Sequence, residues 1–151
     1  MSRKKPSREQ EAAFVMQGGD RFHRILVADG VRFESAPGYE TVLTFFVIRR
    51  AAGSFSIVNI LKTFKGEVCQ SRKVQTKEGV AADAIDREMD AVTGAFSQAI
   101  EAGSGKKLVW HTLDLSAVTD MRQQVQRIEA WGRVKAWMEE IPPEFTRPSV
   151  N

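Results

Sequence analysis

Two apolar runs decide the fold: residues 39–50, YETVLTFFVIRR, and residues 55–64, FSIVNILKTF. Successive side chains of an extended strand point to opposite faces of its sheet. The first run places apolar residues on both faces, with Val42, Phe46 and Ile48 on one and Leu43, Phe45 and Val47 on the other. The second run has the same character up to Lys62. We therefore predict that the first run is a central strand covered on both sides, with the second beside it.

Further strand-like segments flank these runs and are separated from them by short turns. We predict strands at residues 21–28, 31–35 and 67–76, with turns at Asp29-Gly30, Pro37-Gly38 and Lys65-Gly66. Asp-Gly suits a two-residue hairpin because both residues tolerate positive φ. Parallel neighbours would need long crossovers, so the five strands are predicted to form an antiparallel meander. The strand at 67–76 has few apolar side chains and is predicted to lie at an edge.

Helical spacing begins after the meander. In residues 79–102 the apolar side chains recur every three or four residues at Ile85, Met89, Val92, Phe96 and Ile100. A sixth strand is expected at 107–115. A long helix is then expected from Ser116 to about Glu140, before Pro142-Pro143. A short N-terminal helix is predicted from Ser7 to Gly18-Gly19. The fold class is α+β.

The chain has 151 residues, enough for one hydrophobic core. We predict a single domain at 7–141, between a basic tail at 1–6 and a C-terminal tail at 142–151. Cys69 is the one cysteine, which excludes an internal disulfide. No apolar run has the length of a signal peptide or a membrane span, so we predict a cytoplasmic protein.

No residue pattern in the chain predicts catalysis, a metal or a cofactor. His23 and His111 lack acidic or cysteine partners at a known spacing, and we interpret both as structural. Cys69 is expected to be inert. The acidic residues Asp83, Asp86, Glu88 and Asp90 suit the start of a helix. The glycines at 103–105 precede a strand, the reverse of a phosphate-binding loop.

Charge is distributed unevenly along the chain. The net charge is only +3, but residues 49–77 hold seven basic and one acidic side chain, whereas residues 78–102 hold one and six. The basic set is Arg49, Arg50, Lys62, Lys65, Arg72, Lys73 and Lys77. Cations beside aromatic groups are typical of surfaces that bind single-stranded nucleic acid, because phosphates need Lys or Arg and bases need flat partners.

The first functional hypothesis is a non-enzymatic protein that binds single-stranded DNA or RNA on an open sheet face. Its cations would be the seven basic residues, which must then share one face, and Tyr39 and Phe64 would stack on bases. At the level of topology alone, a basic sheet backed by a helix is similar to the Whirly group of single-stranded-DNA-binding proteins.

The same charge pattern can also arise without any binding function, and two further functions remain possible. The cations can be a solvated surface that keeps an edge strand from pairing with other chains. The alternative function is a protein-interaction module, such as an adaptor, chaperone or inhibitor, that uses the sheet against an acidic protein. It would form a homodimer through its last helix, with Trp131 and Trp137 at the interface. A small enzyme with a pocket between sheet and helix is the third possibility.

Overall fold

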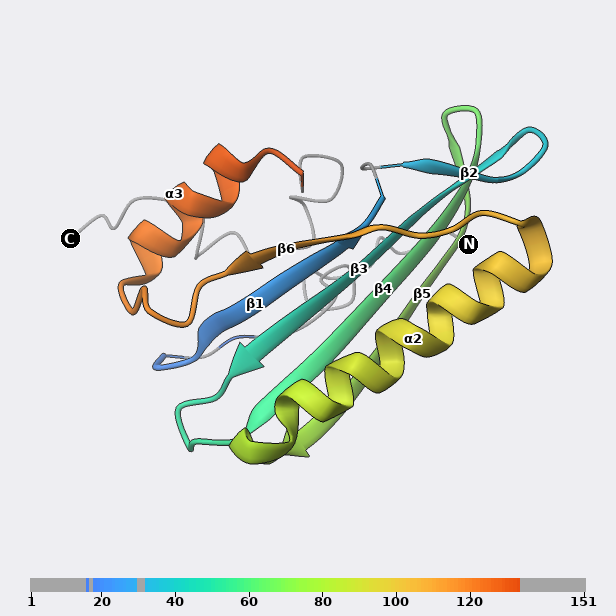
Figure 1. The fold of residues 1–151 in the computed structure, drawn as a ribbon. Helices are drawn as coiled ribbons and strands as arrows, with labels where there is room; N and C mark the ends of the chain where they lie inside the picture. Colours follow the sequence, from blue (N-terminus) through green and yellow to red (C-terminus); the bar gives the residue numbers. More distant parts are fainter. Residues whose placement is uncertain (1–15, 17, 30–31, 134–151) are drawn as a thin grey trace, which may run out of the picture.

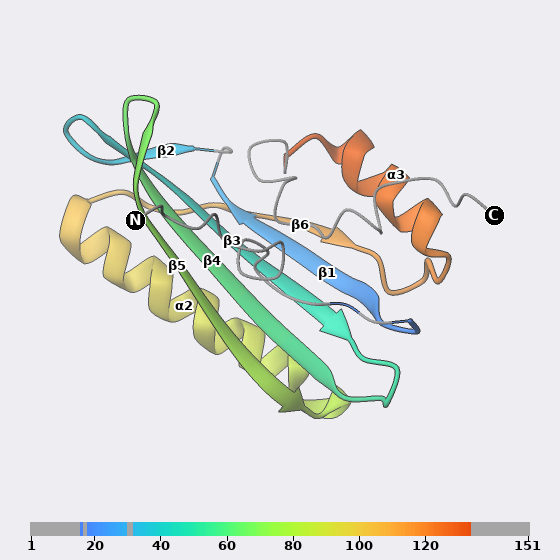
Figure 2. The same cartoon turned by 180° about the vertical axis from the view of Figure 1, so that it is seen from behind.

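The computed structural model, described for residues 16, 18–29 and 32–133, has a six-stranded antiparallel sheet with a helix on each face (Figures 1 and 2). The predicted α+β class is confirmed. Its elements, in chain order, are β1 Arg21–Ala28, β2 Phe33–Ala36, β3 Tyr39–Arg49, β4 Phe55–Lys65, β5 Val68–Val80, the 3-10 turn η1 Ala82–Ala84, α2 Ile85–Ser104, β6 Trp110–Asp114 and α3 Met121–Trp131.

The strand order is β5-β4-β3-β1-β6, so β3 is central and β5 lies at one edge, as predicted. β6 pairs with β1 at the opposite edge. The predicted hairpin between the first two strands is wrong, because β1 and β2 both pair with β3, one after the other. At the expected turn, Asp29 instead contacts residues distant in sequence. Its carboxylate lies 2.8 Å from the Lys106 ammonium, and the backbone N–H of Asp29 donates to the Val109 carbonyl.

Both faces of the sheet bury apolar side chains. On one face Leu43, Phe45 and Val47 pack with the α2 residues Ile85 and Met89, and all five are buried. The predicted spacing of this helix is thus confirmed. On the other face the core comprises Phe22, Ile25, Phe46, Ile48, Val58 and Ile60 together with Leu115 and Ile128, and Met121 and Trp131 of α3 pack against it. β3 is therefore covered on both sides, as its sequence predicts.

The helix boundaries differ from those predicted. β5 continues to Val80, which is buried opposite Phe55, so α2 begins at Ile85 rather than near residue 79. Ser116 does not cap a helix, because its N–H and hydroxyl both donate to Asp114. Asp120 caps α3 instead, and α3 ends before Gly132, which has φ 74°. The helix expected to reach Glu140 is thus shorter. Of the predicted N-terminal helix only Met16 is described, and it is buried with no helix assigned, whereas the basic tail at 1–6 and the C-terminal tail lie outside the described residues.

Gln124 anchors α3 to the edge of β1. Its side chain is fully buried, its Oε1 accepts from the N–H of Phe22 at 2.9 Å, and its Nε2 donates to the Phe22 carbonyl at 2.8 Å. Nε2 also lies 2.6 Å from the carbonyl of Val118. β6 ends opposite Arg24, so no β6 residue reaches Phe22. The side-chain amide takes the place of the missing strand residue.

A second polar clamp holds the start of β1 against the β3–β4 turn. The buried Asp20 carboxylate lies 2.9 Å from the Arg50 guanidinium and accepts from the N–H of Ala51, also at 2.9 Å. Gly19 precedes it with φ +92°, and a Cβ there would lie 2.8 Å from the Ala51 Cβ. Glycine is required at this position for both its conformation and its size.

Replacing Gln124 with Ala is expected to lower the free energy of unfolding by about 2–4 kcal/mol, because it removes several buried hydrogen bonds at once. Urea denaturation measures the change. Gln123→Ala is the matched control, since Gln123 is the exposed neighbour on the same helix. Equal stabilities of the two variants would contradict the role given to Gln124.

Gly19→Ala is expected to destabilise the fold by about 1–3 kcal/mol through backbone strain and the contact with Ala51. Gly18→Ala is the control, because nothing lies within 4 Å of a Cβ at that position and its φ is not positive. Thermal unfolding followed by circular dichroism compares the two. A Gly19 variant as stable as the Gly18 variant would show that the close approach is not needed.

Candidate binding surface

The seven basic residues do not lie on one face. Lys73 and Lys77 pair with Leu61 and Ile57, whose side chains belong to the α2 side of the sheet. Lys62 and Arg72 face each other across β4 and β5 and alternate with these residues, so they lie on the α3 side. Lys62 is only 5% exposed. The open, uniformly basic sheet face that the sequence suggested is absent from the described residues.

Arg49 is the last residue of β3, and Arg50 directly follows the strand. Arg50 is held by an intramolecular network: it contacts Asp20, its Nε donates to the Ser56 hydroxyl at 2.9 Å, and Glu78 lies 3.6 Å away. Ser56 in turn donates to Glu78. Arg50 therefore links the start of β1 with β4 and β5 at this end of the sheet, and a role in fold stability accounts for its position.

The two predicted stacking groups already have cations against their rings. The Arg32 guanidinium lies 4.1 Å from the centre of the Phe64 ring and 3.0 Å from the Glu40 carboxylate. Phe64 is also half-buried against the α3-side core. The Lys65 ammonium lies 5.8 Å from the centre of the Tyr39 ring. The sequence analysis missed Arg32, because nothing in the local pattern predicts that the loop before β2 reaches the β4–β5 turn.

The surface that stays exposed is strand β5. From Val68 to Gly79 every residue except the half-buried Val74 is exposed, and in the described part of the chain β5 pairs with β4 alone. Arg72, Lys73 and Lys77 belong to this strand, and Lys77 lies 2.6 Å from Glu88 of α2. The structure thus gathers three of the seven cations on one edge strand, with Lys65 at the preceding turn.

Of the two histidines, His23 has the more distinctive environment. It is the extra residue of a bulge in β1, because its neighbours Phe22 and Arg24 pair with the adjacent β3 residues Ile48 and Val47. Its ring meets the Phe55 ring edge to face at 4.8 Å. Burial lowers the pKa of His23 below its ordinary value of 6.5, and the cations of Arg24 and Arg49 act in the same direction, against the carboxylates of Asp114 and Asp86. His111 lies on β6 opposite Val27.

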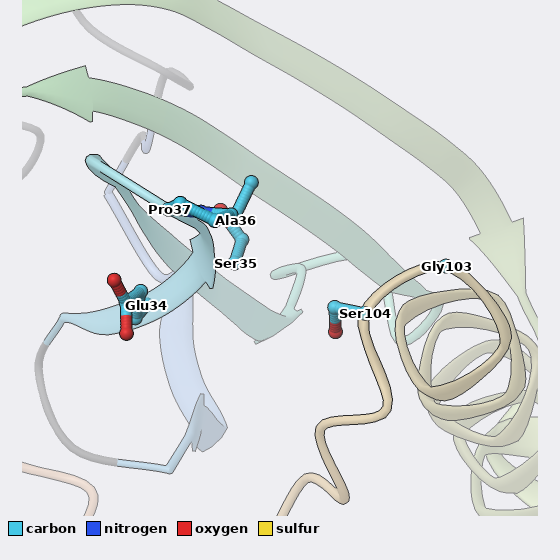
Figure 3. A pocket seen from close by; sticks show the side chains of 6 residues that line it. All are labelled: Glu34, Ser35, Ala36, Pro37, Gly103 and Ser104. Carbon is cyan, nitrogen blue, oxygen red and sulfur yellow. The ribbon is translucent and has the colours of Figure 1, made fainter.

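The remaining candidates for chemistry offer little. Cys69 is exposed on β5, and its thiol donates to the Ser71 carbonyl at 3.4 Å. A hollow of about 340 Å³ lies between the β2–β3 turn and the end of α2, lined by Glu34, Ser35 and Ser104 among others (Figure 3). The Ser35 hydroxyl accepts a hydrogen bond from the Thr41 hydroxyl, and the Ser104 hydroxyl donates to the Ile100 carbonyl. Among the described residues, no group of three His, Cys, Asp or Glu could hold a metal ion.

The two tryptophans expected at a dimer interface are only partly described. Trp131 is half-buried and packs against the α3-side core of its own chain. Trp137 lies outside the described residues. In the part of the chain with assigned positions, no helix is long and apolar enough to cross a membrane.

The lowered pKa of His23 predicts that stability falls with acidification. Between 6.5 and the lower folded value the unfolded chain binds more protons, so the free energy of unfolding decreases as pH falls through this range. His23→Gln should flatten this dependence, measured by urea denaturation between pH 7 and pH 5, whereas the control His111→Gln should keep it. Equal slopes for the His23 variant and the wild type would show that another group is responsible.

Comparisons with known proteins add no assignment to this geometry: no family model, no curated protein and no solved structure matches the chain.

Proposed function

We propose that this protein is a non-enzymatic interaction module that binds an acidic protein partner along strand β5. One observation carries the proposal: β5 is an edge strand of 13 residues, nearly all of them exposed. It has three basic side chains and one acidic side chain, Glu78. Exposed cations on a surface attract anionic partners and speed their encounter. A cytoplasmic location fits this proposal and stays a prediction.

Single-stranded nucleic acid is the second candidate partner. Arg72, Lys73 and Lys77 follow one extended strand, an arrangement that suits successive phosphates. Against this, Phe64 is half-buried with Arg32 over its ring, Lys65 approaches Tyr39, and the apolar cores on both sheet faces are buried. Stacking on bases, which supplies much of the affinity for single strands, therefore has little support, and the protein partner is favoured.

Titrations with three labelled probes test the function: poly-L-glutamate, single-stranded oligothymidylate and its duplex with oligoadenylate, each at low and at physiological salt. We expect poly-L-glutamate to bind with an affinity that decreases with salt. Lys73→Glu should weaken this binding about threefold to tenfold, because it reverses one exposed charge.

Arg127→Glu is the matched control, since it makes the same charge change on the exposed side of α3, at the opposite edge of the sheet from β5 (Figure 1). It should change binding less than about twofold. Absence of polyglutamate binding at low salt would overturn the acidic-protein proposal. If oligothymidylate then binds and Lys73→Glu weakens it, nucleic acid is the partner.

A further inference from the structure

The outer edge of β5 exposes backbone as well as side chains. In an antiparallel strand every second residue directs its N–H and C=O toward the same neighbour. β5 has β4 on one side and no strand among the described residues on the other. About half of its 13 residues therefore direct both backbone groups outward. A polypeptide strand can satisfy these groups, whereas a nucleic acid cannot reproduce the ladder.

Two irregularities limit where such a partner could pair. The β4–β5 register shifts between Thr63 and Phe64 and again between Phe55 and Ile57. Between these shifts the ladder is regular, from Ser71 opposite Thr63 to Lys77 opposite Ile57. Bulges disrupt strand pairing, so they leave the stretch from Ser71 to Lys77 as the part of the edge that can accept another strand.

The chemistry of this stretch favours an acidic occupant. Its charged residues are Arg72, Lys73 and Lys77, with no acidic residue between Ser71 and Lys77. Arg72 lies on the α3 side and Lys73 and Lys77 on the α2 side, so cations flank the edge on both faces. A second copy of β5 would bring the same positive charges together, whereas glutamate or aspartate side chains would be attracted to them, in addition to the Glu88 carboxylate that already pairs with Lys77.

Helix α2 supplies an apolar contact beside the same edge. The helix lies across one face of the sheet next to β5 (Figures 1 and 2). Lys77 of β5 forms an ion pair with Glu88 of α2. Val92 lies one helical turn beyond Glu88, where it packs against the α2-side core and keeps part of its surface exposed. A strand added to β5 would therefore have α2, with Glu88 and the exposed part of Val92, on one of its faces.

From this geometry we infer that β5 accepts an extended acidic polypeptide segment as an additional strand, paired with Ser71 to Lys77. The inference rests on the proposed function and specifies its binding mode: backbone hydrogen bonds provide affinity, and acidic side chains on the face of Arg72 or on that of Lys73 provide selectivity.

N-methylated peptides test the inference without altering the protein. The probe is a labelled peptide in which glutamate and valine alternate. Methylating every backbone nitrogen removes its donors, whereas methylating every second nitrogen leaves one edge able to pair. We expect the fully methylated peptide to bind at least about tenfold more weakly, and at least one of the two half-methylated peptides to bind like the parent.

Hydrogen exchange and a charge swap provide the protein-side readouts. The parent peptide should slow amide exchange at Ser71 to Lys77, and Lys73→Glu should bind a lysine–valine peptide more tightly than the wild type does. Equal binding of parent and fully methylated peptides would overturn strand addition, while polyglutamate binding would leave the proposed function intact. Concentration-dependent dimerisation that protects β5 in the absence of peptide would also overturn the inference, because the occupant would be a second copy.

Discussion

The two-sided burial of β3 is the constraint on which the rest of the structure depends. Phe45 and Phe46 are adjacent in sequence, point to opposite faces, and are both buried. The sheet consequently needs apolar cover on each side, which α2 gives to one face and α3 to part of the other. With the centre of the sheet occupied in this way, charged side chains can stay exposed only at its ends and edges. The exposed cations of residues 49–77 accordingly lie on β5 and at the end of β4, whereas Lys62 within β4 is buried.

Much of this architecture is readable from local patterns. The two-faced composition of residues 39–50 predicts the central strand, and the three-and-four spacing from Ile85 to Ile100 predicts the helix against it. The polar sequence after Lys65 correctly predicts an edge. These successes share a cause, since each pattern reports the burial of its own side chains, and burial dominates the free energy of folding.

The errors arise where distant residues decide the local structure. Asp29-Gly30 has the composition of a hairpin turn, but Lys106 and Val109 hold Asp29 and direct the chain elsewhere. Ser116 resembles a helix cap, but it is taken by Asp114. The prediction that all seven basic residues share one face is wrong partly for a simpler reason. Adjacent residues of a strand, such as Arg72 and Lys73, point to opposite faces of the sheet. The burial of Lys62 and the Arg32–Phe64 contact, by contrast, need the complete packing of the chain.

The pairing of Gln124 with Phe22 joins residues 102 positions apart. The hairpins among β2, β3, β4 and β5 connect close neighbours in the chain and can form early, whereas β1 finds β6 and α3 only after most of the chain has been made. During synthesis, one edge of β1 stays unpaired until β6 has left the ribosome, and Phe22 at the start of this edge stays unpaired until Gln124 has followed. The slow, long-range closure of the sheet is thus the step at which a newly made chain is most exposed to aggregation.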